Sequence, residues 1–219
     1  GGNRLYLNDG TGVFSDATDT AGVRKGYWGW ASCAADFNND GYHDLFHVNG
    51  MDEPATNAYL QDPSRLFFNN GDGTFTEYAQ PLGLVDTRSG RGVTCFDGDR
   101  DGDIDIIVSN NNDDVSLFRN DGGSQLNYVN ISLRGEAPNT QAIGARIYAS
   151  TGGLTQLREV HNGNNFVSQN PAEQHFGLSN AMQVDTLRVV WPDGRETSRT
   201  NITSNQRVTV VYPDGWSTD

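Results

Sequence analysis

The sequence predicts an all-β protein: β-propeller-type blades, two plus a partial third, followed by a β-sandwich. Three observations predict this fold: the composition, a repeat of 61 residues, and a change of pattern near residue 124. Only 35% of the 219 residues are hydrophobic, whereas 26 are glycine. Such a composition is typical of many short strands joined by turns rather than of long buried helices.

The N-terminal repeat occurs in two separate stretches of the chain. Residues 4–14 match residues 65–75, and residues 36–45 match residues 97–106 at the same offset. A third copy begins at residues 117–122, after a shorter connector. Because two motifs have a common offset, we interpret them as one repeated structural unit.

Each unit carries sequence signals for about four short strands. An apolar run meets an Asn-Asp-Gly or Asn-Gly signal, which strongly predicts a hairpin. A Gly-rich strand, an Asp-rich loop and a second apolar strand, such as residues 105–109, follow. Four strands are the content of one propeller blade. Residues 1–123 are therefore predicted to form two blades and the first strand of a third.

The second half of the chain has a different pattern. Apolar and polar residues alternate in residues 128–133 and 186–191, and Pro-Asp-Gly turns follow at 192–194 and 213–215. Residues 124–219 are therefore predicted to form a second all-β domain, most simply a sandwich.

The charge of the chain excludes some classes of partner. It has 28 Asp and Glu against 15 Lys and Arg, a formal net charge of -13. This charge repels phosphate backbones and anionic lipids, so we expect no nucleic-acid partner. No stretch approaches the run of about 18 apolar residues that a spanning helix needs, so we expect no membrane span. Residues 1–5 lack the features of an export signal, which we expect to be removed or to lie outside this sequence.

The two Asp-rich loops have the spacing of a calcium-binding loop. Oxygen-bearing side chains occupy positions 1, 3, 5 and 9, position 7 offers its backbone carbonyl, and glycine at position 6 permits the sharp turn. The candidate ligands of the first loop are Asp36, Asn38, Asp40, Asp44 and the carbonyl of Tyr42. Those of the second loop are Asp97, Asp99, Asp101, Asp105 and the carbonyl of Asp103.

Physical chemistry favours Ca²⁺ as the ion and distinguishes the loops from an EF-hand. An EF-hand has a bidentate Glu at position 12, where this chain has His47 and Val108, so the Asp at position 9 is expected to be the closing ligand. Two carboxylates about 4 Å apart repel by about 4 kcal/mol at an effective dielectric near 20, so converging aspartates are expected to need a cation. Magnesium demands stricter geometry, and transition metals prefer His or Cys.

We therefore predict two Ca²⁺ sites with a structural role. The second loop supplies four carboxylates and the first only three, so the second is expected to bind more tightly. The alternative interpretation is that both loops are merely polar turns.

At these residues the chain resembles the FG-GAP/VCBS repeat family of calcium-loop propeller blades. Its second half resembles the ASPIC/UnbV domain. The motifs that carry the second resemblance are Ala142-Ile143-Gly144-Ala145-Arg146, Arg158-Glu159-Val160, Ser168-Gln169, His175-Phe176-Gly177-Leu178 and Trp191-Pro192-Asp193-Gly194. This pairing is similar to the C-terminal part of the cartilage acidic protein family and its bacterial relatives. The resemblance implies a calcium-binding protein that is secreted or held at the cell surface.

The number of blades raises the question of partners. Family propellers close with about seven blades, and two blades cannot close a ring. The open edges are expected to be covered by further blades of a longer chain, or by a second copy in a homo-oligomer or filament. We favour self-association.

The two cysteines and the histidines are expected to be structural. Cys33 and Cys95 are 62 residues apart, one more than the repeat, so their side chains should lie on opposite faces of equivalent strands. This predicts two buried thiols without a disulfide between them, with an intermolecular bond as the alternative. No catalytic signature accompanies the four histidines, and we expect a structural hydrogen bond for His175. Trp28 and Trp30 are expected in a blade core, although exposed aromatics could stack on sugar rings.

Taken together, the sequence predicts a non-catalytic, extracellular or cell-surface module for adhesion or for building an assembly. The alternative is a glycan-binding or glycan-active module of a larger secreted protein. Protein or glycan ligands are both compatible with the sequence. Asn130 and Asn201 lie in glycosylation sequons, whose use depends on the host.

Overall fold

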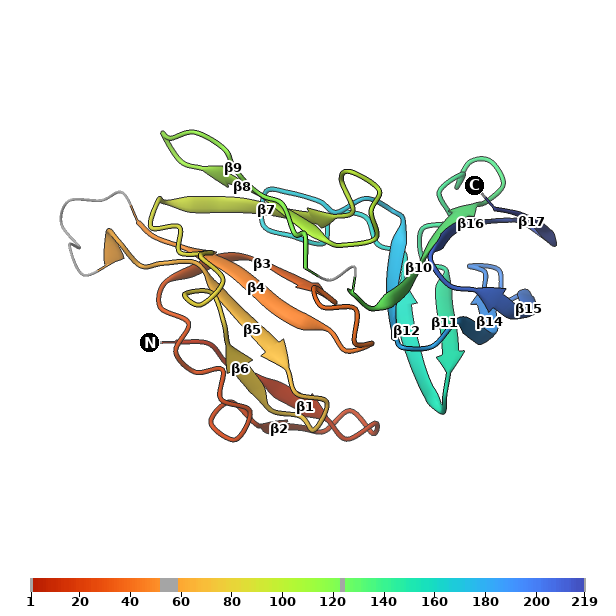
Figure 1. Ribbon diagram of the computed structural model, residues 1–219, viewed down its shortest axis with the longest axis horizontal. Coiled ribbons are helices and arrows are strands. Elements are labelled where there is room, and N and C mark those ends of the chain that lie inside the picture. Colours follow the sequence, from red (N-terminus) through yellow and green to blue (C-terminus); the bar gives the residue numbers. More distant parts are fainter. Residues whose placement is uncertain (1, 52–58, 123–124, 219) are drawn as a thin grey trace.

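A computed structural model describes residues 2–51, 59–122 and 125–218 (Figure 1). These residues form seventeen β-strands and contain no α-helix, which confirms the predicted all-β class. The predicted boundary at residues 123 and 124, and part of the connector between residues 50 and 64, lie outside the described residues.

The first nine strands form three separate sheets. One sheet pairs β1 with β2, one has the order β3-β4-β5-β6, and one has the order β7-β8-β9. The strands are β1 (Tyr6–Asn8), β2 (Phe14–Asp16), β3 (Gly29–Ala35), β4 (Asp44–Asn49), β5 (Arg65–Asn69), β6 (Phe75–Glu77), β7 (Gly90–Phe96), β8 (Asp105–Asn110) and β9 (Ser116–Phe118). All neighbours in these sheets are antiparallel.

The sheets are out of phase with the sequence repeat by half a unit. Strands β3 and β4 end the first unit, and β5 and β6 begin the second, yet these four strands form one complete blade. The described chain therefore has one four-stranded blade between a two-stranded hairpin and a three-stranded sheet. Local similarity marks the repeating unit, whereas long-range pairing decides where each sheet begins.

Each Asp-rich loop joins the first two strands of a sheet. The first loop connects β3 to β4, and the second connects β7 to β8. Position 6 has a left-handed backbone in both loops, with φ of 98° at Gly41 and 97° at Gly102. Because a side chain is strained there, glycine is required at this position.

The last eight strands form a sandwich, as predicted. One sheet has the order β13-β10-β16-β17 and is mixed, because β10 and β16 pair in parallel. The other sheet has the order β12-β11-β14-β15 and is antiparallel. The strands are β10 (Asn127–Arg134), β11 (Arg146–Thr151), β12 (Leu154–Glu159), β13 (Gln174–Ser179), β14 (Gln183–Val190), β15 (Glu196–Thr203), β16 (Gln206–Val211) and β17 (Gly215–Thr218). Side chains from both sheets, including Ile131, Ile147, Phe176 and Leu187, form one buried core. We call β10–β17 the C-terminal sandwich.

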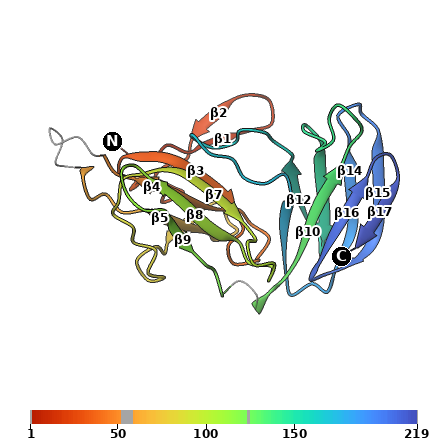
Figure 2. The same cartoon turned by 90° about the horizontal axis from the view of Figure 1, so that it is seen from above.

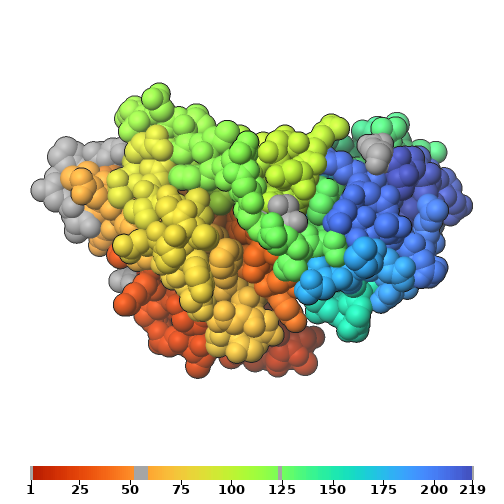
Figure 3. Space-filling view, viewed as in Figure 1, coloured from red at the N-terminus to blue at the C-terminus, as the bar shows by residue number. Residues whose placement is uncertain are grey.

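The C-terminal sandwich lies against the blades on the side of the Asp-rich loops (Figures 2 and 3). The Asn39 carbonyl accepts a hydrogen bond from the Ser179 backbone N–H at 2.8 Å. The segment between β12 and β13 also reaches β7, where Ser168 Oγ contacts the backbone of Val93 and Asn170 Oδ1 accepts from the Cys95 N–H. The two loops therefore lie at the contact between the blades and the C-terminal sandwich.

The two tryptophans have different environments. Trp30 packs against the blade core and donates its indole N–H to the Gly50 carbonyl at 2.8 Å. Trp28 is 40% exposed, and its ring centroid lies 4.9 Å from that of Tyr59. The prediction of a core position thus holds for Trp30, while Trp28 lies at the surface.

The prediction of two separate thiols is wrong, because Cys33 and Cys95 form a disulfide with their Cα atoms 6.5 Å apart. The 61-residue repeat makes Cys95 equivalent to Ala34, which is the neighbour of Cys33 in β3. Successive side chains of a strand point to opposite faces, so the two cysteines do lie on opposite faces of equivalent strands, as predicted. Neighbouring blades, however, pack with the opposite faces of their sheets in contact. Side chains on opposite faces of β3 and β7 consequently meet between the blades.

We expect removal of this cross-link by Cys33→Ala with Cys95→Ala to lower the free energy of unfolding. Because the bridge closes a sequence separation of 62 residues, the loss is about 4 kcal/mol in the chain-entropy model. Urea unfolding of the variant, and of the wild type with and without reductant, measures it. Two reactive thiols in unfolded protein that has not been reduced would contradict the disulfide.

Candidate metal centre

The second Asp-rich loop brings three carboxylates together. One oxygen each of Asp97, Asp99 and Asp101 lies within 4.8 Å of the others. Asp99 and Asp101 are exposed, whereas the Asp97 side chain is 1% exposed. Within the described residues, no group donates a hydrogen bond to the buried Oδ1 of Asp97. A buried anionic oxygen without a partner is strongly unfavourable, so this arrangement fits a cation.

The carboxylate at position 9 of the second loop accepts two backbone hydrogen bonds. Asp105 Oδ2 accepts a hydrogen bond from the Gly98 N–H at 3.0 Å, and its Oδ1 accepts from the Asn120 N–H at 2.8 Å. It is not part of the three-carboxylate cluster. Asp105 therefore links the beginning of the loop to the second residue after β9.

The first loop repeats this clamp. Asp44 accepts hydrogen bonds from the Phe37 N–H at 2.9 Å and from the Asn69 N–H at 2.8 Å. Phe37 and Gly98 are equivalent loop residues, and Asn69 and Asn120 are equivalent residues at the end of the third strand of each sheet. Comparing the two repeats would have identified the pair of asparagines, but not the hydrogen bonds that link them to the loops.

The remaining carboxylates of the first loop face its own backbone. Asp36 accepts from the Asp40 N–H at 3.1 Å and from the Gly41 N–H at 2.7 Å. Asp40 accepts from the Tyr42 N–H at 2.9 Å and from Asn38 Nδ2 at 3.0 Å. The first loop is thus closed by internal hydrogen bonds.

Burial makes the charged forms of these acids costly. It raises the pKa of Asp36 to about 7 and the pKa of Asp44 to about 8. Desolvation also raises the pKa of Asp101. A nearby divalent cation would favour the ionised forms and would therefore lower the pKa values of these aspartates. The donor set, which consists of hard oxygen atoms, suits Ca²⁺.

At position 7, the carboxylate of Asp103 is buried rather than turned to solvent. Its Oδ1 accepts from Asn39 Nδ2 at 3.3 Å, while its backbone N–H donates to Asp101 Oδ1 at 2.9 Å. Asn39 also donates to the Gly102 carbonyl at 3.2 Å. The turns of the two loops are therefore in direct contact with each other.

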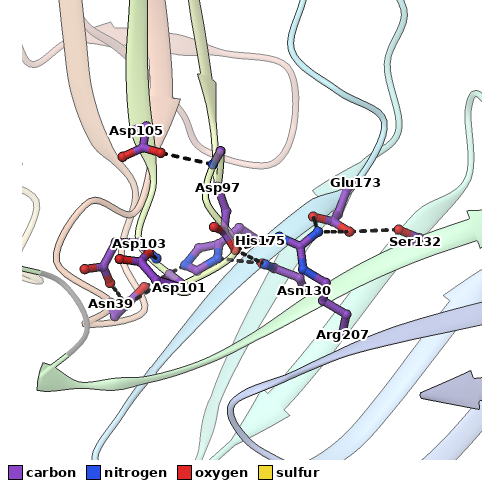
Figure 4. Close-up of polar contacts among 12 residues, drawn as sticks. Asn39, Asp97, Asp101, Asp103, Asp105, Asn130, Ser132, Glu173, His175 and Arg207 are labelled. Atoms are coloured by element: carbon purple, nitrogen blue, oxygen red, sulfur yellow. Dashed lines mark hydrogen bonds and ion pairs between the residues drawn. The ribbon is translucent and has the colours of Figure 1, made fainter. Parts of the chain in front are cut away.

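The C-terminal sandwich contributes residues to this site that were not predicted from the sequence. Asp97 Oδ2 accepts from Arg207 at 2.7 Å and from Asn130 Nδ2 at 2.8 Å (Figure 4). Arg207 also lies 3.0 Å from a carboxylate oxygen of Glu173. Arg207 and Asn130 belong to neighbouring strands, β16 and β10, which pair in parallel. Only the packing of the two units brings them to the loop.

His175 links the two loops through asparagines. Its Nδ1 lies 2.8 Å from Asn130 Oδ1, and its Nε2 lies 2.6 Å from Asn39 Oδ1. Burial, with Arg158 nearby, lowers the pKa of His175 to about 3. These contacts agree with the structural hydrogen-bonding role predicted for this histidine. Burial also lowers the pKa of His43 and of His47.

A cavity of about 780 Å³ lies between the blades and the C-terminal sandwich, and its lining includes Arg158 and His161.

The two asparagines of the glycosylation sequons differ in exposure. Asn130 is 1% exposed and hydrogen-bonded to Asp97, so it is inaccessible in the folded chain. The sequon residue Asn201 is exposed.

We predict that Asp105→Ala destabilises the protein with or without calcium, by about 3 kcal/mol, because two backbone N–H groups lose a charged acceptor. The matched variant Asp99→Ala alters an exposed side chain and should lower stability only when calcium is present. Urea unfolding in calcium and in excess chelator compares them. Wild-type stability of Asp105→Ala in chelator would contradict the clamp.

Comparisons with known proteins agree with the two-part architecture. The family model described as "FG-GAP-like repeat" matches residues 1–47 and 56–108, and the model described as "ASPIC and UnbV" matches residues 135–216. Cartilage acidic protein 1 of Mus musculus is 42% identical over 97% of this chain, which spans 42% of that protein's length. Cartilage acidic protein 1 of Xenopus tropicalis is 33% identical over 51% of this chain and 16% of that protein.

A search of solved structures gives a much weaker likeness. A putative cell adhesion protein from Bacteroides ovatus has a TM-score of 0.27 at 9% identity, covering 100% of this chain and 96% of that chain. This TM-score is too low to support an argument about fold or function. The likeness in sequence is direct: the chain carries FG-GAP-like repeats followed by an ASPIC and UnbV domain, and over 97% of its length it is similar to cartilage acidic protein 1.

Proposed function

We propose that this chain is a non-catalytic, calcium-binding extracellular module that serves adhesion or the building of an extracellular assembly. The observation that carries the proposal is the cluster of Asp97, Asp99 and Asp101, with a buried carboxylate oxygen of Asp97 directed to no hydrogen-bond donor in the described chain. Asp36, Asn38 and Asp40 occupy the same positions in the first loop. That the module has no catalytic activity stays a prediction.

Two findings support the extracellular location. The relatives are named for cartilage and for acidic character, and this chain shares the acidic character with its net charge of -13. A disulfide joins Cys33 to Cys95, and disulfides persist mainly in oxidising, extracytoplasmic environments.

Within the described residues, no helix is long and apolar enough to cross a membrane.

Calcium would act as a structural ion in this proposal. Each loop joins the first two strands of a sheet, and aspartates of both loops are buried. An ion that neutralises these carboxylates stabilises the folded state without taking part in chemistry. Extracellular calcium, at millimolar concentration, suffices even for weak sites of this class.

We expect two binding events in a calorimetric calcium titration, with the tighter one at the second loop. Asp101→Asn should weaken the tighter event, and the position-matched Asp40→Asn should weaken the other. Saturation at about one hundred times Kd stabilises by about 2.7 kcal/mol per site, which chelator would remove. Absence of binding heat, together with identical unfolding in calcium and in chelator, would favour polar turns over metal sites.

We also propose that the incomplete sheets pair with additional strands. Strand β6 lies beside β5 in the complete blade, whereas no described strand occupies the equivalent place beside β9. Leu117 of β9 is 64% exposed, and Tyr6 and Phe14 of the β1–β2 hairpin are 55% and 61% exposed. Open edges with exposed apolar side chains favour pairing with another strand. A second copy of this chain or further blades of a longer chain could supply it.

Sedimentation velocity over a wide concentration range distinguishes these two sources. We expect association in calcium, because pairing of the open edges buries apolar surface at sheets that the ions hold together. A substitution of Leu117→Lys should weaken association, since a charge on an edge strand opposes pairing. A compact monomer at every concentration would refute self-assembly.

A further inference from the structure

We propose that the C-terminal sandwich completes the calcium site of the second loop: Asn130 and Arg207 position Asp97, and calcium binding is thereby coupled to docking of the sandwich on the blades. The inference rests on the calcium binding proposed above. It assigns a positioning role to two residues that lie outside the loop and outside the repeat.

The first argument is a difference between equivalent aspartates. Asp36 and Asp97 both occupy position 1, and Asp36 has both oxygens occupied by N–H groups of its own loop. Asp97 Oδ2 instead bonds to Asn130 and Arg207 across the interface. Asp97 Oδ1 has no hydrogen-bond donor among the described residues, so we infer that it is the oxygen offered to an ion beside Asp99 and Asp101. The sandwich therefore sets the orientation of this carboxylate.

The second argument concerns charge. An arginine beside a calcium ligand would oppose cation binding if its own charge were not balanced. Glu173 contacts Arg207 at 3.0 Å and is in turn bonded to Ser132 Oγ at 3.0 Å. Arg207 is thus shared between two carboxylates and acts mainly as a hydrogen-bond donor to Asp97. Such outer partners commonly fix the orientation of a metal ligand.

The third argument is the tight packing of the sandwich on the loops. A Cβ added at Gly102, the sixth residue of the second loop, would overlap the Tyr128 ring of β10. A Cβ added at Gly177 of β13 would overlap Asp36 and the backbone of Asn39 in the first loop. The same turns that shape the loops therefore form the docking surface, so a change in loop shape must affect docking. By linkage, docking must affect calcium affinity to the same extent.

The test measures calcium affinity of one loop at a time by calorimetry. An Asp40→Asn background isolates the second loop, and an Asp101→Asn background isolates the first. We expect Arg207→Gln and Asn130→Ala to weaken the second loop by about 10- to 100-fold. The same substitutions should change the first loop by less than about threefold. Arg188→Gln, which removes an exposed ion pair with Glu196 elsewhere in the sandwich, is the matched control and should change neither.

Rescue separates positioning from a general loss of structure. Arg207→Lys keeps the charge but not the planar fork, and it should recover only part of the affinity. If Arg207→Gln does not fold, Arg207→Lys and the measurement below still test the inference. Unchanged second-loop affinity in the folded Arg207 and Asn130 variants would overturn it. A wild type that binds no calcium would instead overturn the proposed function itself.

Hydrogen exchange gives a readout of docking that does not depend on affinity. The Ser179 N–H bonds to the Asn39 carbonyl across the interface, and the Cys95 N–H bonds to Asn170. Calcium should slow exchange in peptides containing these amides in the wild type, and this protection should be largely lost in Asp101→Asn. Equal exchange with and without calcium, under conditions where calorimetry shows the second loop to be occupied, would refute the coupling.

Discussion

The rest of the structure depends on one constraint: several aspartate carboxylates are buried in two adjacent loops, and their charges must be compensated. Each buried anion needs donors or a cation, because an uncompensated charge in the interior is strongly unfavourable. Asp44 and Asp105 use backbone N–H groups, and Asp97 uses side chains of the C-terminal sandwich. Satisfying these groups links strands, blades and the sandwich, so the electrostatics of the loops also organise the fold.

The clamp at position 9 explains how a short loop can fix a sheet. A single carboxylate accepts hydrogen bonds from the second residue of its loop and from an asparagine at the end of the third strand, so it sets the distance between two segments of one sheet. Asn120 then donates its side-chain amide to the Phe37 carbonyl at 2.8 Å, which connects the second loop's sheet to the first loop. In the second unit, Asp105 and Asn120 therefore provide both the link within a sheet and the link to the neighbouring blade.

Properties encoded locally could be predicted from the sequence, and those decided by long-range packing could not. Turn chemistry and alternation predict the strands, and the spacing from Asp97 to Asp101 predicts the carboxylate cluster. The half-unit shift between repeat and sheet depends on which strands pair. The disulfide depends on how neighbouring blades face each other, and the contact of Arg207 with Asp97 spans 110 residues between two units. A short stretch of sequence does not determine which strands pair, how the blades pack or which residues of the sandwich contact the loop.

The two loops share a sequence pattern but differ in what holds them. In the first loop, both carboxylate oxygens of Asp36 accept hydrogen bonds from backbone N–H groups of the same loop. The shape of this loop is therefore determined largely by local structure. The second loop has its first aspartate held by another unit, so its shape depends on whether that unit is docked. His175 and Asn39 join the two environments through a chain of short polar contacts. Equivalent positions in a repeat can therefore have different functions when only one of them accepts hydrogen bonds from side chains of another unit.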